Sequence, residues 1–104
     1  MKQYDLYSNT DPDTKKTYPF FVDIQTNLLD MLNSRVVIPL TKAQPDKALP
    51  KNLCPQLEIN GVQYYLLTHQ ITTVARPFLK KNTGSLLLSR TEIINSLDFL
   101  ISGI

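Results

Sequence analysis

The sequence predicts a mainly β fold, a twisted antiparallel sheet of five or more strands that is closed by one C-terminal α-helix. Runs of β-branched and aromatic residues recur between turn-forming stretches, as is typical of strands. Asn60-Gly61 separates two of these runs, and residues 89–104 change to helical spacing of their apolar side chains. With 104 residues the chain is close to the most common domain size, so we expect a single domain over residues 1–104.

Two strands are predicted before residue 26. Residues 3–8 alternate polar and apolar side chains and predict the first strand. Residues 9–17 are rich in Asp, Asn, Thr and Lys, which indicates a loop. Residues 18–25 are aromatic and β-branched and predict the second strand, with Pro19 near its start, where a missing N–H is tolerated.

The next segment carries the third predicted strand. Residues 26–33 are predicted to form either a short helical turn or a bent continuation of the second strand. The composition of residues 35–40 predicts a buried strand. We expect Pro39 at a sheet edge or at the end of that strand, because proline cannot donate a hydrogen bond to a neighbouring strand. Residues 41–54 predict a long mobile loop, a kind that is often functional.

The clearest local prediction is a hairpin of strands 56–59 and 62–68. Asn60-Gly61 readily takes the positive φ angles of a type I′ turn between them. After the hairpin we expect a further stretch of sheet past a bend, a short edge strand, and a turn towards the final helix: residues 71–74, 76–81 and 82–84, respectively.

The final helix is predicted from its start signal and its apolar periodicity. Ser89 and Glu92 have the spacing of a capping box, and Gly103 suits the position after a helix end. Phe99 projects near the polar face. An apolar end of this kind needs either the core or a binding partner to cover it, and the sequence leaves both open. Six apolar side chains fall within an arc of roughly 120° at helical spacing: Ile93, Ile94, Leu97, Leu100, Ile101 and Ile104.

Composition and charge narrow the classes of function. The formal net charge of +2 is too small to indicate a protein that binds nucleic acid by itself. Cys54 is the only cysteine, so no intramolecular disulfide can form, and we expect no metal site. The first residues do not resemble a signal peptide, and no apolar run reaches membrane-spanning length. We therefore expect a cytoplasmic protein with no membrane partner.

Candidate catalytic residues are few. His69, the only histidine, is expected to be a surface or hydrogen-bonded residue, with a general base as the alternative. Asp23 and Asp30 are either paired carboxylates or residues with capping and turn roles. No Gly-rich phosphate loop or nucleophile elbow occurs in the sequence. We therefore expect a binding protein that is not an enzyme and needs no cofactor, with Leu28-Leu29 and the helix end as candidate contacts.

Three blocks of the sequence carry a resemblance to a known family. Residues 21–30, FVDIQTNLLD, followed by residues 35–40, RVVIPL, resemble the N-terminal half of the CcdB toxins. Residues 90–104, RTEIINSLDFLISGI, resemble their closing helix. The order and spacing of the blocks agree over essentially the whole chain. The resemblance implies an SH3-like barrel with a small antiparallel sheet and a C-terminal helix, as in the CcdB, MazF and Kid toxins, and a twofold homodimer.

The same resemblance implies a function. It implies a bacterial type II toxin that binds the A subunit of DNA gyrase and traps the enzyme on cleaved DNA. A CcdA-like antitoxin would neutralise the toxin through a disordered segment that folds on it. The toxin would contact operator DNA only as part of its complex with the antitoxin. Ser102 stands where the best-known member has tryptophan. The family's gyrase-binding positions correspond here to Thr26, Leu28, Leu29, Ile101, Ser102, Gly103 and Ile104.

Two alternatives remain from the sequence. One is a ribonuclease toxin of the MazF or Kid type, which shares the fold and would need Arg35, Arg76 or Arg90 together with His69. The N-terminal Gly-Asp-containing strand typical of MazF is missing from residues 1–7. The other alternative is a homologue that has lost toxicity and only binds the antitoxin.

Overall fold

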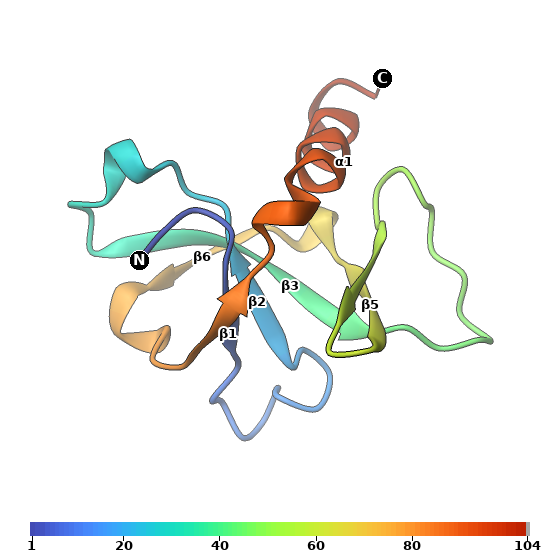
Figure 1. Ribbon diagram of the computed structural model, residues 1–104, viewed down its shortest axis with the longest axis horizontal. Helices are drawn as coiled ribbons and strands as arrows, with labels where there is room; N and C mark the ends of the chain where they lie inside the picture. Colours follow the sequence, from blue (N-terminus) through green and yellow to red (C-terminus); the bar gives the residue numbers. More distant parts are fainter. Residues whose placement is uncertain (104) are drawn as a thin grey trace.

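The computed structural model describes residues 1–103, and in them a curled antiparallel sheet forms a half-barrel with one C-terminal helix (Figure 1). This confirms the predicted mainly β fold. The strands follow the order β4-β5-β3-β2-β1-β7, and β6 pairs with a separate part of β3. The elements are β1 Asp5–Ser8, β2 Phe20–Asp23, β3 Ser34–Lys42, β4 Gln56–Ile59, β5 Val62–Leu66, β6 Thr72–Ala75, β7 Asn82–Ser85 and α1 Arg90–Ser102, with short 3-10 helices η1 Asn27–Leu29, η2 Thr68–Gln70, η3 Arg76–Phe78 and η4 Leu87–Ser89.

The long strand β3 holds the sheet together and explains its proline. One edge of β3 pairs with β2, while its other edge pairs first with β6 and then with β5. Pro39 lies inside this central strand, so the prediction of an edge or terminal position was wrong. The N–H and C=O of a strand residue point to the same side, and the Pro39 carbonyl accepts from Leu67 N at 3.0 Å. The missing N–H therefore faces the junction between β6 and β5, where no ladder bond is lost.

The predicted hairpin is confirmed as β4 and β5. Asn60 has φ 52° and Gly61 has φ 82°, the positive angles that a type I′ turn requires. The register pairs Ile59 with Val62, so the turn has the shortest possible two-residue loop.

Two predictions for the segment after β6 were wrong. Residues 76–81 do not form an edge strand, because Pro77 lacks an N–H and the chain turns instead through η3. Residues 82–84 do not form a turn but belong to β7, which pairs with β1 as an edge strand. Gly84, at φ 149°, lies where the register of this pair shifts, a conformation that favours glycine.

The two faces of the sheet have separate cores. On one face, Leu6, Val22 and Ile38 pack beneath Ile93 of α1. On the other face, Tyr7 and Phe21 pack with residues of the η3 segment. Successive residues of β1 and β2 alternate between these clusters, as the period of two in a strand requires. Cys54 and Leu49, from the predicted long loop, pack on Tyr65 and cover a third apolar cluster.

The predicted final helix is confirmed, but its start differs. Within the described residues, Ser89 makes no side-chain cap hydrogen bond, so the predicted capping box with Glu92 was wrong. The 3-10 helix η4 leads directly into α1, and Ser89 has φ −103° and ψ 15°, which is not the extended conformation of a capping residue. Gly103 ends the helix as predicted, in the left-handed conformation, and its N–H donates to the Phe99 carbonyl at 2.9 Å.

The buried face of α1 is rotated away from the predicted arc. Ile93 and Ser96 are buried, whereas Ile94 is exposed. Ser96 is accommodated because its hydroxyl accepts from Thr68 Oγ1 at 2.9 Å and donates to the Ile93 carbonyl at 2.8 Å. The first half of α1 therefore lies on the sheet, and its last turns project beyond it (Figure 1).

Candidate functional site

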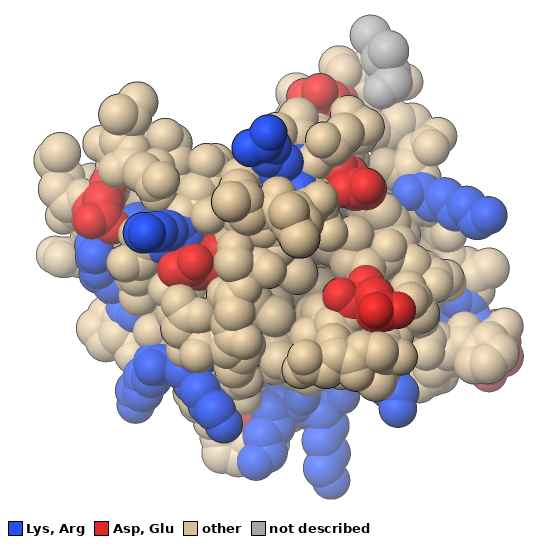
Figure 2. All heavy atoms as spheres, in the orientation of Figure 1, with Lys and Arg blue, Asp and Glu red and all other residues tan. Residues whose placement is uncertain are grey.

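The loop between β2 and β3, residues 24–33, presents an unusually apolar surface. Leu28 is 83% exposed and Met31 is 81% exposed, and Leu29 and Leu32 are also exposed. The segment contains η1, and Thr26 Oγ1 accepts from Leu28 N at 3.4 Å at its start. In Figure 2 most of the surface at the upper left, where this loop lies, consists of uncharged atoms, with acidic and basic groups between and below them. Clustered exposed apolar side chains of this kind mark interaction surfaces.

A buried ion pair forms the base of this loop. Arg35 and Asp23 both have fully buried side chains, and Arg35 Nε donates to Asp23 Oδ2 at 2.8 Å. Arg35 Nη2 lies 2.8 Å from the same oxygen, but without the geometry of a second hydrogen bond. Arg35 Nη1 donates to Asp30 Oδ1 at 3.1 Å. The two carboxylates considered as an acid–base pair are therefore the two anionic partners of one arginine.

Gln25 completes the support of the loop. Its Nε2 donates to the Leu29 carbonyl at 3.0 Å, and its Oε1 accepts from Val36 N at 3.1 Å. Asp23 Oδ1 in turn accepts from Gln25 N at 3.0 Å. These bonds tie η1 to the start of β3, so the exposed leucines stand on a hydrogen-bonded base.

The end of α1 is the second projecting surface. Ile101 is 83% exposed, which rules out a core role for this residue in the single chain. Ser102 is exposed, and its hydroxyl donates to the Asp98 carbonyl at 2.7 Å. Gly103 is exposed and ends the helix, and Ile104, the last predicted site residue, lies outside the described residues.

The single chain does not bring these two surfaces together. The β2–β3 loop and the end of α1 project separately, on the left and at the top of Figure 1, from the same side of the sheet. Thr26, Leu28 and Leu29 therefore belong to one projection, and Ile101 to Gly103 belong to the other.

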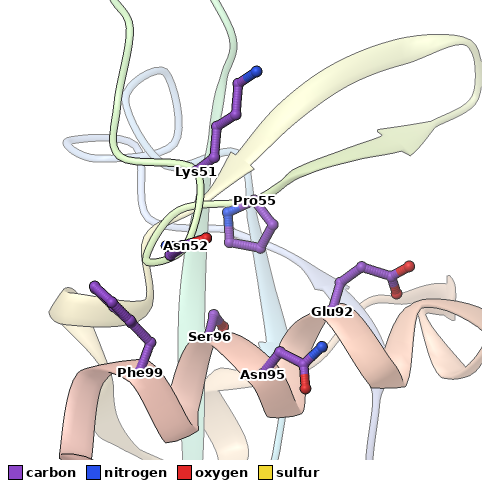
Figure 3. Close-up of a pocket in the computed structure, with 7 residues that line it drawn as sticks. All are labelled: Lys51, Asn52, Pro55, Glu92, Asn95, Ser96 and Phe99. Atoms are coloured by element: carbon purple, nitrogen blue, oxygen red, sulfur yellow. The ribbon is translucent and has the colours of Figure 1, made fainter. Parts of the chain in front are cut away.

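A cavity of about 310 Å³ separates α1 from the segment that precedes β4 (Figure 3). The ring of Phe99 lies at one end of it and Glu92 at the other, with Ser96 on the floor, and the Lys51 side chain points away from the helix. Phe99 is half-buried, so it faces this cavity and not the tip of the helix. The lining residues are Lys51, Asn52, Pro55, Glu92, Asn95, Ser96 and Phe99.

Sequence reasoning missed two features of the site. Met31 and Leu32 extend the apolar surface that Leu28-Leu29 begins, and four large apolar residues within five positions, without strand alternation, are a signal that was available. The role of Arg35 was also missed. A lone arginine beside the apolar run Val36 to Leu40 indicates a buried charge, and such a charge needs a carboxylate.

The residues considered for catalysis lie in different places. Arg35 is fully buried against carboxylates, Arg90 is exposed at the start of α1, and His69 is exposed on η2. His69 Nδ1 lies 3.5 Å from Cys54 Sγ, so these two side chains could be considered as a nucleophile–base pair. Burial raises the pKa of the Cys54 thiol, against the smaller lowering effect of a backbone hydrogen bond with Thr68. A raised pKa keeps sulfur as the unreactive thiol.

We expect native Cys54 to react with a thiol reagent such as DTNB at least about a hundredfold more slowly than the denatured chain at pH 8, because both burial and the raised pKa suppress attack. The raised pKa also contributes stability that is complete below the ordinary thiol value of 9.0 and is lost as the pH rises through the higher folded-state pKa. The absorbance of the released thiolate of the reagent follows the reaction of Cys54 with DTNB. Equal rates in native and denatured protein would contradict the assigned environment.

No three His, Cys, Asp or Glu side chains among residues 1–103 are grouped so that they could hold a metal ion. In the same part of the chain, α1 is too short to cross a membrane, and the structure describes no other helix that could do so.

Comparison with models of known protein families gives a match over nearly the whole chain. The family model described as CcdB protein matches residues 3–103 of the 104 residues. A search of curated proteins found no match.

Proposed function

The chain belongs to the CcdB family, the toxins of toxin–antitoxin systems, and on this premise we propose that it binds the A subunit of DNA gyrase and traps gyrase on cleaved DNA. The observation that carries the proposal is the exposure of Leu28 and Ile101, two large apolar side chains at positions to which the resemblance to the CcdB toxins assigns gyrase binding. Burying a side chain of this size contributes on the order of 1.5–3 kcal/mol, which offsets part of the cost of association.

The proposed mechanism is a wedge and needs no chemical step by the toxin. Leu28, Leu29 and Ile101 supply apolar contacts, and Gly103, which has no side chain, permits close approach of the backbone to the target. A protein that binds the cleaved gyrase–DNA complex more tightly than the resealed complex shifts the population towards the cleaved state. Thr26 supports the loop because its side-chain oxygen accepts a hydrogen bond from Leu28 N.

Ser102 changes how the binding energy is distributed. Its hydroxyl is engaged with the Asp98 carbonyl, and a serine offers far less apolar area than the tryptophan of the best-known member. Phe99 faces the cavity beside Pro55 and is not available at the helix tip. We assign the missing contact to Ile101 and to the β2–β3 loop.

The partners follow from the same proposal. A twofold homodimer would present two helix ends and two β2–β3 loops to gyrase, which fits their separate projection from each chain. A CcdA-like antitoxin would neutralise the toxin by folding on it, and operator DNA would be contacted through that complex. The formal charge of +2 agrees with a protein that does not bind DNA by itself.

Co-purification with the gyrase A subunit, followed by supercoiling and cleavage assays, tests the proposal. We expect a stable complex and accumulation of cleaved DNA.

Two variants extend this test. His69→Ala should leave the effect on gyrase intact, and deleting Gly103-Ile104 should abolish gyrase binding while preserving antitoxin binding. A protein that leaves gyrase unaffected and cuts single-stranded RNA would contradict the proposal and support the ribonuclease alternative.

A further inference from the structure

Arg76 fastens the far side of the β2–β3 loop, although it lies more than 40 residues later in the chain. Its backbone N–H donates to the Asn33 carbonyl at 2.7 Å. Its Nη1 donates to the carbonyls of Asp30 and Leu32, the latter at 3.1 Å. Its Nη2 pairs with Asp30 Oδ1 at 3.2 Å. One residue of η3 therefore satisfies three backbone carbonyls and one carboxylate in residues 30–33.

The same carboxylate connects Arg76 to the core. Asp30 Oδ1 lies between the guanidinium groups of Arg76 and Arg35, and Arg35 is paired with Asp23. The side chains of Arg76 and Asp30 are a third and a half exposed, whereas those of Arg35 and Asp23, the inner pair of this network, are fully buried. Residues 29–32 of the loop are thus linked to the interior by these ion pairs together with the hydrogen bonds of Gln25.

Met31 lies between the two carbonyls that Arg76 holds. Its side chain is 81% exposed and so has little packing of its own to fix its direction. Hydrogen bonds on both flanking carbonyls, Asp30 and Leu32, fix the backbone that carries it. Fixing a loop in its binding conformation before association reduces the entropic cost of binding.

We infer that Arg76 is a positioning residue that holds Met31 as an anchor of the gyrase-binding surface, next to Leu28. The inference rests on the proposed function and deepens it, because neither residue belongs to the positions that the family motif assigns. Arg76 acts through the loop backbone. Its planar guanidinium is needed because an ammonium group cannot reach two carbonyls and a carboxylate in the same fixed geometry.

Affinity for the purified gyrase A subunit, measured by calorimetry on the full-length variants, tests the inference. We expect Arg76→Ala and Met31→Ala each to weaken binding by about tenfold. Arg76→Lys should bind about as weakly as Arg76→Ala, because it keeps the charge but loses the fork. Arg90→Ala is the matched control, since Arg90 is exposed and forms no ion pair within residues 1–103, and it should stay within about twofold of wild type.

A double-mutant cycle separates positioning from a general loss of stability. Adding Met31→Ala to Arg76→Ala should weaken binding by no more than about a further twofold, whereas adding Ile101→Ala should multiply the two losses. Amide hydrogen exchange should accelerate in residues 28–33 of Arg76→Ala and remain unchanged in β1 and β2. If Arg76→Ala does not fold, Arg76→Lys replaces it in the cycle, because that change keeps the positive charge and removes the guanidinium fork that holds the two carbonyls.

The outcomes are distinguishable from those of the proposed function. If wild type binds gyrase and Arg76→Ala binds equally well, the inference is wrong and the proposed function stands. Restoration of wild-type affinity by Arg76→Lys, or full multiplication of the Arg76 and Met31 losses, also overturns the inference. If the wild-type protein does not bind the gyrase A subunit, both are overturned.

Discussion

Replacing Leu28 and Ile101 together by aspartate is expected to weaken gyrase binding by about a thousandfold or more. Each change removes a large apolar contact, and a loss of about 1.4 kcal/mol already lowers affinity tenfold. Aspartate also brings a charge that would lose its water at the interface. The measurement is the dissociation constant for the gyrase A subunit, together with accumulation of cleaved DNA.

The control for this pair is Leu88→Asp. Leu88 is a fully exposed leucine on η4, outside the predicted site, so the same change there should leave affinity within about twofold of wild type. Because Leu28 and Ile101 are also highly exposed, the double variant should keep the thermal stability of the wild-type protein. Wild-type affinity in the double variant, or an equal loss in Leu88→Asp, would remove these residues from the binding surface.

Replacing Asp23 by alanine is expected to destabilise the fold by about 3–5 kcal/mol, the usual cost of leaving one buried charge without its partner. Arg35 has a fully buried side chain, and Asp30, its other partner, is half-exposed and lies on a loop. A loss of this size is a large part of the stability of a domain of about 100 residues. Urea unfolding followed by circular dichroism gives the free energy of unfolding.

Two further variants identify the buried pair as the cause. Asp30→Ala removes a half-exposed partner and should cost about 0–1 kcal/mol. The double variant Asp23→Leu/Arg35→Met removes both charges and should recover most of the stability lost in Asp23→Ala, because apolar replacement of a buried pair is often neutral. A loss of stability below about 1 kcal/mol in Asp23→Ala would show that removing Asp23 does not leave Arg35 as an uncompensated buried charge in solution.

The candidate site was predicted from the sequence in part. The sequence around Leu28-Leu29 and the end of the final helix were both predicted as contact sites, and Leu28 and Ile101 are exposed in the structure. Met31 was not predicted: the four large apolar residues at positions 28–32 indicate an apolar loop surface, but residue type alone does not decide whether a methionine in a loop is exposed or buried. The clamp by Arg76 was not predictable either, since it joins segments that are distant in sequence.

The sequence by itself determined the elements whose signals are local. Asn60-Gly61 specifies a two-residue turn through its own backbone preferences, and the spacing of apolar residues after Arg90 specifies a helix that Gly103 ends. These preferences act within a few residues and need no knowledge of the rest of the fold.

Only the tertiary structure decided the features that depend on neighbours in space. Pro39 is tolerated in a central strand because β5 and β6 divide one edge of β3 between them. Ser96 can face the core because the hydroxyl of Thr68 donates a hydrogen bond to the Ser96 hydroxyl there. Arg35 is buried because the carboxylate of Asp23, the last residue of β2, pairs with its guanidinium and the β2–β3 loop brings a second carboxylate, that of Asp30, to it. For Ser96 and Arg35 the energy comes from a partner that chain folding brings near, and Pro39 is tolerated because no strand pairs with its missing N–H; the local sequence specifies neither condition.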